Sequence, residues 1–126
     1  MFDGRDLGDA ERAVDDWQAG IEARATRARE LSARLGNLQA TVRSADESVT
    51  VTVGPGGDLV GLDLTEAIRR RPAADTAQLI LATLRTARRH LTEAVTAATD
   101  ETIGADSATG RAVIASYARR IGDPDE

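Results

Sequence analysis

Arginine is the residue whose type and spacing in this chain are best suited to binding chemistry. Arg85, Arg88 and Arg89 are spaced at i, i+3 and i+4, which places three guanidinium groups on one face of a helix. A guanidinium group stays positively charged and forms paired hydrogen bonds with phosphate oxygens. The spacing therefore predicts a phosphate-binding surface on this helix.

Two further groups of arginines extend the candidate surface. One pair lies seven residues apart on a predicted helix, and a run of three follows a predicted strand. The alternative is that these arginines pair with carboxylates of the same chain or of a second copy and contribute only to solubility. The sequence leaves both interpretations open. The candidate residues are Arg27, Arg34, Arg69, Arg70, Arg71, Arg85, Arg88 and Arg89.

Other residues that could carry out catalysis or bind metal give little support for an enzyme. The chain has no cysteine, and its one histidine, His90, has no second histidine or carboxylate pair at ligand spacing. The glycine-rich stretch at 54–58, GPGGD, joins two predicted strands and does not open a helix, so it does not fit a nucleotide-binding loop. We expect no catalytic residue, no metal site and no cofactor.

Charge is distributed in blocks along the chain. The net charge is −5, yet residues 23–43 contain five arginines and one acid, and residues 69–92 contain six arginines and one acid. Residues 1–22 contain seven acids and two bases. All sixteen basic residues are arginine. Blocks of this kind are typical of interaction surfaces, although the net charge argues against general affinity for nucleic acid.

A long helix is predicted to open the chain. Apolar residues recur at steps of three and four from Leu7 to Val42, and only Arg24 interrupts this heptad pattern. Such a pattern predicts a helix that packs along a partner helix, with a bend or an end near Gly36.

A β-hairpin is predicted at residues 48–64, SVTVTVGPGGDLVGLDL. Its side chains alternate between one apolar and one mostly polar face, and the glycines and proline of 54–58 suit a tight reversal. A two-stranded ribbon is marginally stable alone in water, so other elements must cover it. The apolar face consists of Val49, Val51, Val53, Val60, Leu62 and Leu64.

A second long helix and a short third helix are predicted to follow. After a connector at 65–72, apolar residues again step by four and three from Ile80 to Ala98, and Gly104 is the predicted end of that helix. Residues 111–121 are predicted to form a short helix before an acidic tail. The fold class is therefore α+β, with few aromatic residues for a large core.

Three features predict a cytoplasmic protein. The longest apolar runs are far shorter than a membrane span, and the N-terminal residues are acidic where a signal peptide requires basic residues. The absence of cysteine also suits a reducing compartment.

The order of elements resembles the YbaB/EbfC family of bacterial nucleoid-associated proteins, in its actinobacterial form. The resemblance rests on VTVTVGPGGDLVGLDL and DTAQLILATLRTA, and it predicts a family domain over 1–103 with a C-terminal extension at 104–126. It implies a tweezer-like homodimer whose hairpins pair into a shared sheet through the apolar hairpin residues. It further implies binding of double-stranded DNA with little sequence preference, in the nucleoid.

The resemblance also leaves a second function open. Actinobacterial relatives of the family include proteins associated with type VII secretion, which resemble adaptors or stabilisers of protein partners. An adaptor would use the same dimer and present its long helices to a protein partner instead of DNA.

Overall fold

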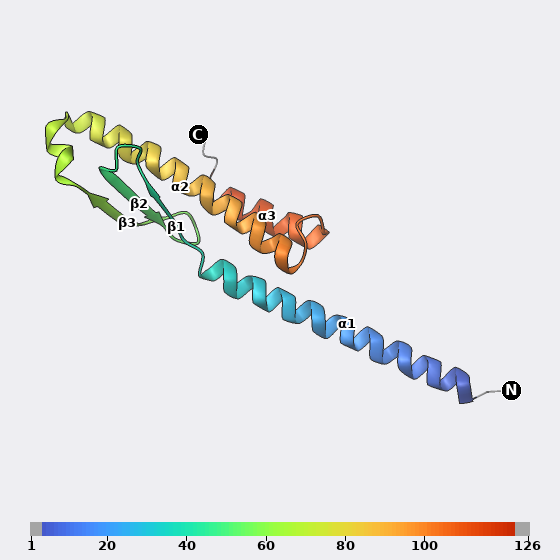
Figure 1. Ribbon diagram of the computed structural model, residues 1–126. Coiled ribbons are helices and arrows are strands. Elements are labelled where there is room, and N and C mark those ends of the chain that lie inside the picture. The colour runs from blue at the N-terminus through green and yellow to red at the C-terminus, as the bar shows by residue number, and fades with distance from the viewer. Residues whose placement is uncertain (1–3, 123–126) are drawn as a thin grey trace.

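The computed structural model describes residues 4–122, with side chains from residue 7 onward. It contains a long helix, a three-stranded antiparallel sheet and two further helices (Figure 1). The acidic tail at 123–126 lies outside the described residues. The elements are α1 (Gly4–Gly36), β1 (Ala40–Arg43), β2 (Val49–Val53), β3 (Leu59–Leu64), the 3₁₀ turn η1 (Glu66–Arg70), α2 (Ala73–Thr102) and α3 (Ala108–Ile121).

The predicted hairpin is present as β2 and β3, but the sheet has a third strand, β1, that was not predicted. The first helix ends at Gly36, and residues 40–43 form β1, which pairs antiparallel with β2. Val42, predicted to continue the helix, lies opposite Val51 in this ladder. The strand β2 is therefore central, and the hairpin is supported from within the chain.

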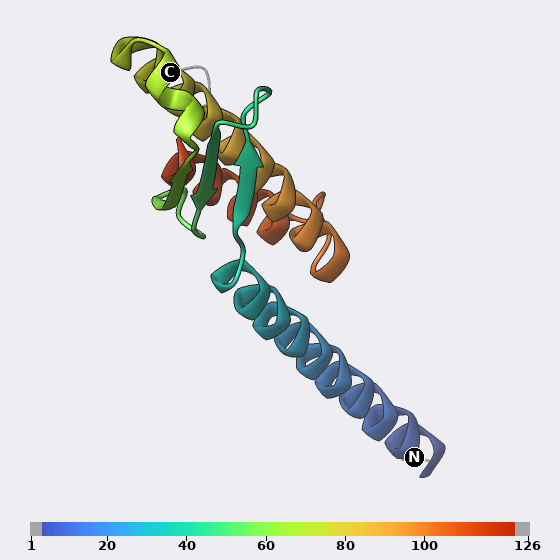
Figure 2. The ribbon, with the colours of Figure 1, turned by 60° about the vertical axis from the view of Figure 1, so that its left-hand side comes forward.

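The valines of β2 form the centre of the core. Val49, Val51 and Val53 are fully buried, while the threonines between them are half-buried. The helix α2 packs over β1 and β2 and buries Leu91 and Val95 in the same cluster (Figure 2). The predicted apolar face of β2 is confirmed, and α2 covers it.

The apolar face of β3 differs from that of β2. Leu62 and Leu64 lie opposite Val51 and Val49, yet these leucines are 41% and 42% exposed. A register shift places Leu59 opposite Val53 and leaves Val60 without a partner in the ladder, so Val60 does not continue the predicted alternation. Within the described chain, α2 packs mainly on β1 and β2 and leaves this strand largely uncovered.

The C-terminal helix folds back along α2. Gly104, at φ +86°, ends α2 through a hydrogen bond from its N–H to the Thr99 carbonyl. The Ser107 side chain then caps α3 by accepting a hydrogen bond from the N–H of Gly110. Ile121, at the end of α3, is buried against the hairpin turn, where a Cβ on Gly57 would come within 3.1 Å of its Cα.

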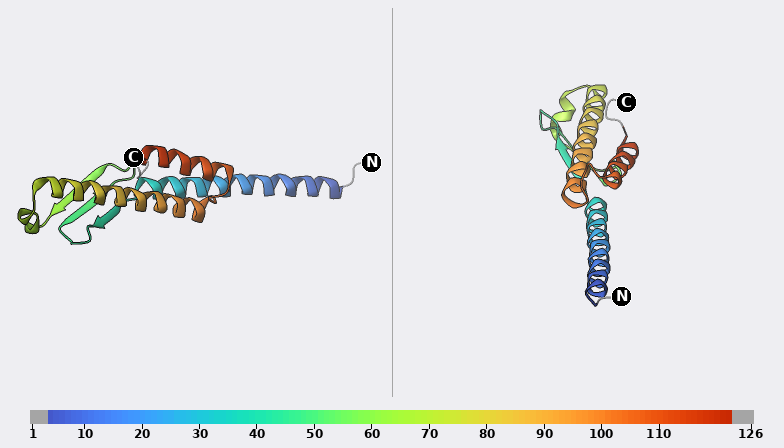
Figure 3. Two further views of the ribbon diagram at one scale, coloured as in Figure 1. Left: turned by 90° about the horizontal axis from the view of Figure 1, so that it is seen from above. Right: turned by 90° about the vertical axis from the view of Figure 1, so that its right-hand side faces the viewer.

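Only the C-terminal part of α1 belongs to the body of the protein. Leu31 and Leu35 are buried in the core, and this end of α1 packs against α2, which also contacts α3 (Figure 3). The N-terminal half projects away from the other elements, and its apolar positions are exposed. Among the described residues, no helix is both long and apolar enough to span a membrane.

Candidate nucleic-acid interface

All the candidate arginines except Arg27, which lies on α1, form three groups beside or on α2. Arg69 to Arg71 come just before its first residue, Arg85 to Arg89 are near its middle, and Arg34 pairs with Glu101 near its end. At 1.5 Å per residue, neighbouring groups are about 20 Å apart. The structure therefore distributes the predicted residues over α1, the segment before α2 and α2 itself, and does not gather them into one patch of the protomer.

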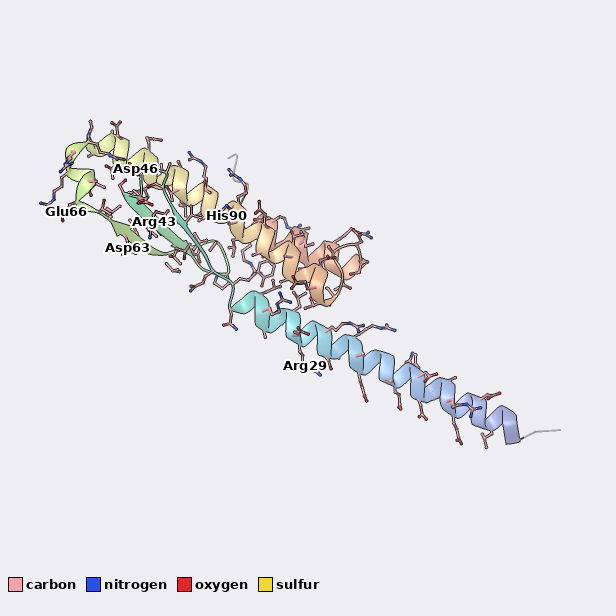
Figure 4. All side chains as sticks on the ribbon, viewed as in Figure 1. Arg29, Arg43, Asp46, Asp63, Glu66 and His90 are labelled. Atoms are coloured by element: carbon pink, nitrogen blue, oxygen red, sulfur yellow. The ribbon has the colours of Figure 1, made fainter. Side chains whose placement is uncertain are left out.

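Arg71 stabilises the turn between β1 and β2 through a bond to Asp46. Its guanidinium group donates to the Asp46 carboxylate, which also accepts hydrogen bonds from the Ser44 hydroxyl at 2.8 Å and from the Ser48 N–H at 3.0 Å. These bonds favour the charged carboxylate, so Arg71 and the serines hold the pKa of Asp46 well below its ordinary value of 3.8. Figure 4 shows Asp46 at this turn, close to Arg43.

Asp46→Asn is expected to destabilise the protein at neutral pH, because it removes the charged acceptor of these bonds. The folded-state pKa of Asp46 is lower than the unfolded-state pKa, so its stabilisation is complete above pH 3.8 and is lost as the pH falls further. The difference in melting temperature between wild type and variant should therefore be largest near pH 7 and shrink below pH 4.

Thermal melts followed by circular dichroism from pH 2 to pH 7 measure this difference. Glu66→Gln is the matched control, since its carboxylate bonds Arg69 at 2.9 Å with both side chains about four-fifths exposed. Such a surface pair contributes little to stability. Equal losses in the two variants at pH 7 would contradict the role given to Asp46.

Arg88 is tied to the hairpin turn. Its Nε donates to the Gly57 carbonyl at 3.0 Å, and a Cβ on the neighbouring Gly56 would lie 3.7 Å from Cδ of Arg120. Arg120 in turn lies 4.9 Å from the ring centroid of Tyr117, at cation–π distance. Arg120 is a basic residue beside this surface that the sequence analysis did not identify, because only the packing of α3 on α2 brings it there.

Arg34 and Arg27 flank the junction of the three helices. Arg34 donates to Glu101 at 2.6 Å and so ties α1 to α2. Arg27 and Arg24 line a cavity of about 330 Å³ with Ala28 and Ile103. Arg24 therefore marks the point where α1 leaves the body, which fits its place as the one charged residue of the heptad pattern.

Four of the eight candidate arginines have no bonded partner among the described residues. No hydrogen bond or ion pair within residues 7–122 involves the guanidinium groups of Arg27, Arg70, Arg85 and Arg89. The other four are bonded to carboxylates or to a carbonyl of the same chain. Pairing within the chain therefore accounts for four of the arginines, and phosphate binding by the other four stays a prediction.

His90 lies on the surface of α2 (Figure 4). Across the described residues, no group of three histidines, cysteines or carboxylates is arranged to hold a metal ion.

These features define an α+β protein in which one long helix crosses a three-stranded sheet and carries basic side chains on its outer surface. A family model, described as the YbaB/EbfC DNA-binding family, matches residues 12–106. The chain belongs to this family, which is non-enzymatic and nucleoid-associated. No curated protein matches the sequence. The helix α3 begins at Ala108 and so lies outside the matched region.

Proposed function

We propose that this protein binds duplex DNA as a homodimer, through phosphate contacts of arginines on its helices and without reading base edges. Membership of the DNA-binding family over residues 12–106 is the observation that carries the proposal. Contacts to phosphate position a protein on DNA but carry no sequence information. Low sequence preference and strong dependence on salt follow from them.

The strand β3 is the proposed dimer element. It is an edge strand, and it exposes Leu59, Leu62 and Leu64. An edge strand with an uncovered apolar face is a ready template for pairing with another chain. Pairing of two β3 strands around a two-fold axis would join the two sheets and cover these leucines. The proposed dimer residues remain Val49, Val51, Val53, Val60, Leu62 and Leu64, of which the three valines act by supporting the sheet from the core.

The arginines without partners are proposed as the main phosphate contacts. Arg85 and Arg89 are exposed on the middle of α2, Arg70 is exposed near its start, and Arg27 is exposed on α1. A guanidinium group already bonded to a carboxylate has part of its charge neutralised. Arg34, Arg69, Arg71 and Arg88 are therefore proposed to contribute less to DNA affinity than the other four. A dimer doubles the number of phosphate contacts, and it also doubles the net charge of −5 that each chain carries.

Double substitution of Arg85 and Arg89 by Ala is expected to weaken DNA binding and to reduce its dependence on salt. Each phosphate contact contributes about −0.9 to the slope of log affinity against log salt, so loss of four contacts per dimer should reduce the slope by about 3 to 4 units. Electrophoretic shifts of a short duplex across a salt series measure this slope. Light scattering of the same samples gives the oligomeric state.

Arg12→Ala is the matched control, because Arg12 lies on the acidic part of α1 and pairs with Asp9. Its removal should leave the slope unchanged. The absence of any shift at low salt with wild-type protein would refute the proposal. An unchanged slope in the Arg85 and Arg89 variant would refute only the assignment of these residues.

A second role, as a protein adaptor, is favoured by one specific observation. The projecting half of α1 carries exposed apolar side chains that nothing in the described chain covers.

A further inference from the structure

The projecting half of α1 is a free-standing amphipathic helix. We call residues 7–23 the arm, because the junction with α2 and α3 begins at Arg24. Every residue of the arm except Gly8 and Gly20 is exposed. At 1.5 Å per residue the arm extends about 25 Å from the body. It is a long rod whose surface is open to solvent on all sides (Figures 1 and 3).

One side of the arm is an apolar stripe. Leu7, Val14, Trp17 and Ile21 follow steps of seven, three and four, so they lie along one face of the helix. They are 50%, 53%, 64% and 42% exposed. Single exposed apolar residues are common on protein surfaces, but a contiguous stripe that includes tryptophan marks an interaction surface. The heptad spacing is that of a helix that packs against another helix.

The charge of the arm identifies the chemistry of its partner. The arm contains five acidic residues and one arginine, and this arginine, Arg12, is paired with Asp9. DNA is repelled by such a surface. A second arm would double the negative charge along the same rod, which disfavours pairing of two copies. A helix with basic side chains beside its own apolar stripe complements the arm in both respects.

The stripe continues into a groove at the junction of the helices. Ala28 of α1 lies on the same heptad positions as Val14 and Ile21, and it lines the groove together with Ile103 and Thr109. Arg24 and Arg27 stand at this groove. The apolar stripe of the arm is therefore continuous with the groove at the junction of the helices.

We propose that the arm is a docking rod for a partner protein, which lays a basic amphipathic helix along the stripe of Leu7, Val14, Trp17 and Ile21. This function is separate from DNA binding and does not depend on it. The groove at Ala28 and Ile103 receives the end of the partner helix, where a carboxylate would meet Arg24 and Arg27.

Trp17 provides a direct measurement, because it is the only tryptophan of the chain. The probe is a synthetic peptide of leucine and lysine with helical spacing, about 18 residues long to match the arm at 1.5 Å per residue. We expect it to move Trp17 emission to shorter wavelength in a saturable and salt-sensitive manner. A matched peptide with glutamate in place of lysine should leave the emission unchanged.

Variants of the arm separate docking from folding. Val14→Asp combined with Ile21→Asp should weaken binding of the lysine peptide by about tenfold or more, since charges replace two apolar contacts. Ala19→Asp, which adds a charge on the side of the arm opposite the stripe, should not weaken it. Circular dichroism of both variants should match wild type, because these side chains are exposed.

Three results would overturn the proposal. Trp17 emission that does not respond to the lysine peptide would show that the stripe does not take a basic helix. An equal response to both peptides would show that the arm's charge does not select its partner. Emission that already indicates a buried indole and depends on protein concentration would show that a second copy covers the stripe.

Discussion

Leu91→Ala is expected to lower the free energy of unfolding by about 2–5 kcal/mol, the range for leucine-to-alanine changes that leave a cavity in a packed core. Leu91 is fully buried on α2 and belongs to one cluster with the three valines of β2. The core is small and contains few large side chains. A single cavity there removes a large share of a total stability that, for a domain of this size, is on the order of 5–15 kcal/mol.

Urea unfolding followed by circular dichroism measures this loss. Leu7→Ala is the matched control, because it makes the same chemical change on a helix position that is 50% exposed. Surface substitutions of this kind usually change stability by less than about 0.5 kcal/mol. Similar losses in the two variants would contradict the assignment of the core to the interface between α2 and β2.

Periodicity predicted α2 and β2 well, because their apolar faces pack directly on the core. The steps from Ile80 to Ala98 placed α2, and Gly104 marked its end through a left-handed backbone conformation that glycine adopts easily. The alternation of Val49, Val51 and Val53 likewise predicted the buried face of β2. In both elements, the apolar residues that define the sequence pattern are also the residues that the core buries.

The strand β1 could not be separated from the helix by periodicity alone. Leu38 and Val42 continue the heptad steps of α1, yet they lie beyond the helix end at Gly36. Over four residues, the pattern of Ala40 to Arg43 fits either a strand or a helix. The deciding factor is the pairing of these residues with β2, which is a tertiary interaction.

The helix positions of the candidate arginines were predictable from the sequence, but their bonded partners were not. The spacing of Arg85, Arg88 and Arg89 places them on neighbouring positions of α2, as expected. The bond from Arg88 to the Gly57 carbonyl spans 31 residues, and that from Arg34 to Glu101 spans 67. Contacts over such separations depend on the whole fold, so the sequence alone did not distinguish bonded arginines from free ones.

Leu62→Asp combined with Leu64→Asp is expected to convert the proposed dimer to monomers and to weaken DNA binding by about 100-fold, the order of the gain from two linked binding surfaces. Both leucines lie on the apolar side of β3, opposite the core valines, and are 41% and 42% exposed in the protomer. In a dimer joined at β3, the new carboxylates would be buried against those of the second copy. Burial of unpaired charges of like sign is strongly unfavourable. Analytical ultracentrifugation gives the mass, and electrophoretic shifts of the same samples give the affinity.

The Leu62 and Leu64 variant is expected to lose assembly but not folding. Both side chains are exposed in the protomer, so the new carboxylates are not buried in a monomer. The variant should therefore unfold cooperatively and keep the circular dichroism spectrum of a folded chain. Leu7→Asp combined with Val14→Asp adds the same charge to the arm, at positions that are 50% and 53% exposed, and should remain dimeric. A β3 variant that stays dimeric would show that the two copies meet elsewhere. A β3 variant that is monomeric but binds DNA as wild type would show that one protomer carries the whole DNA-binding surface, which the wide spacing of its arginine groups along α2 argues against.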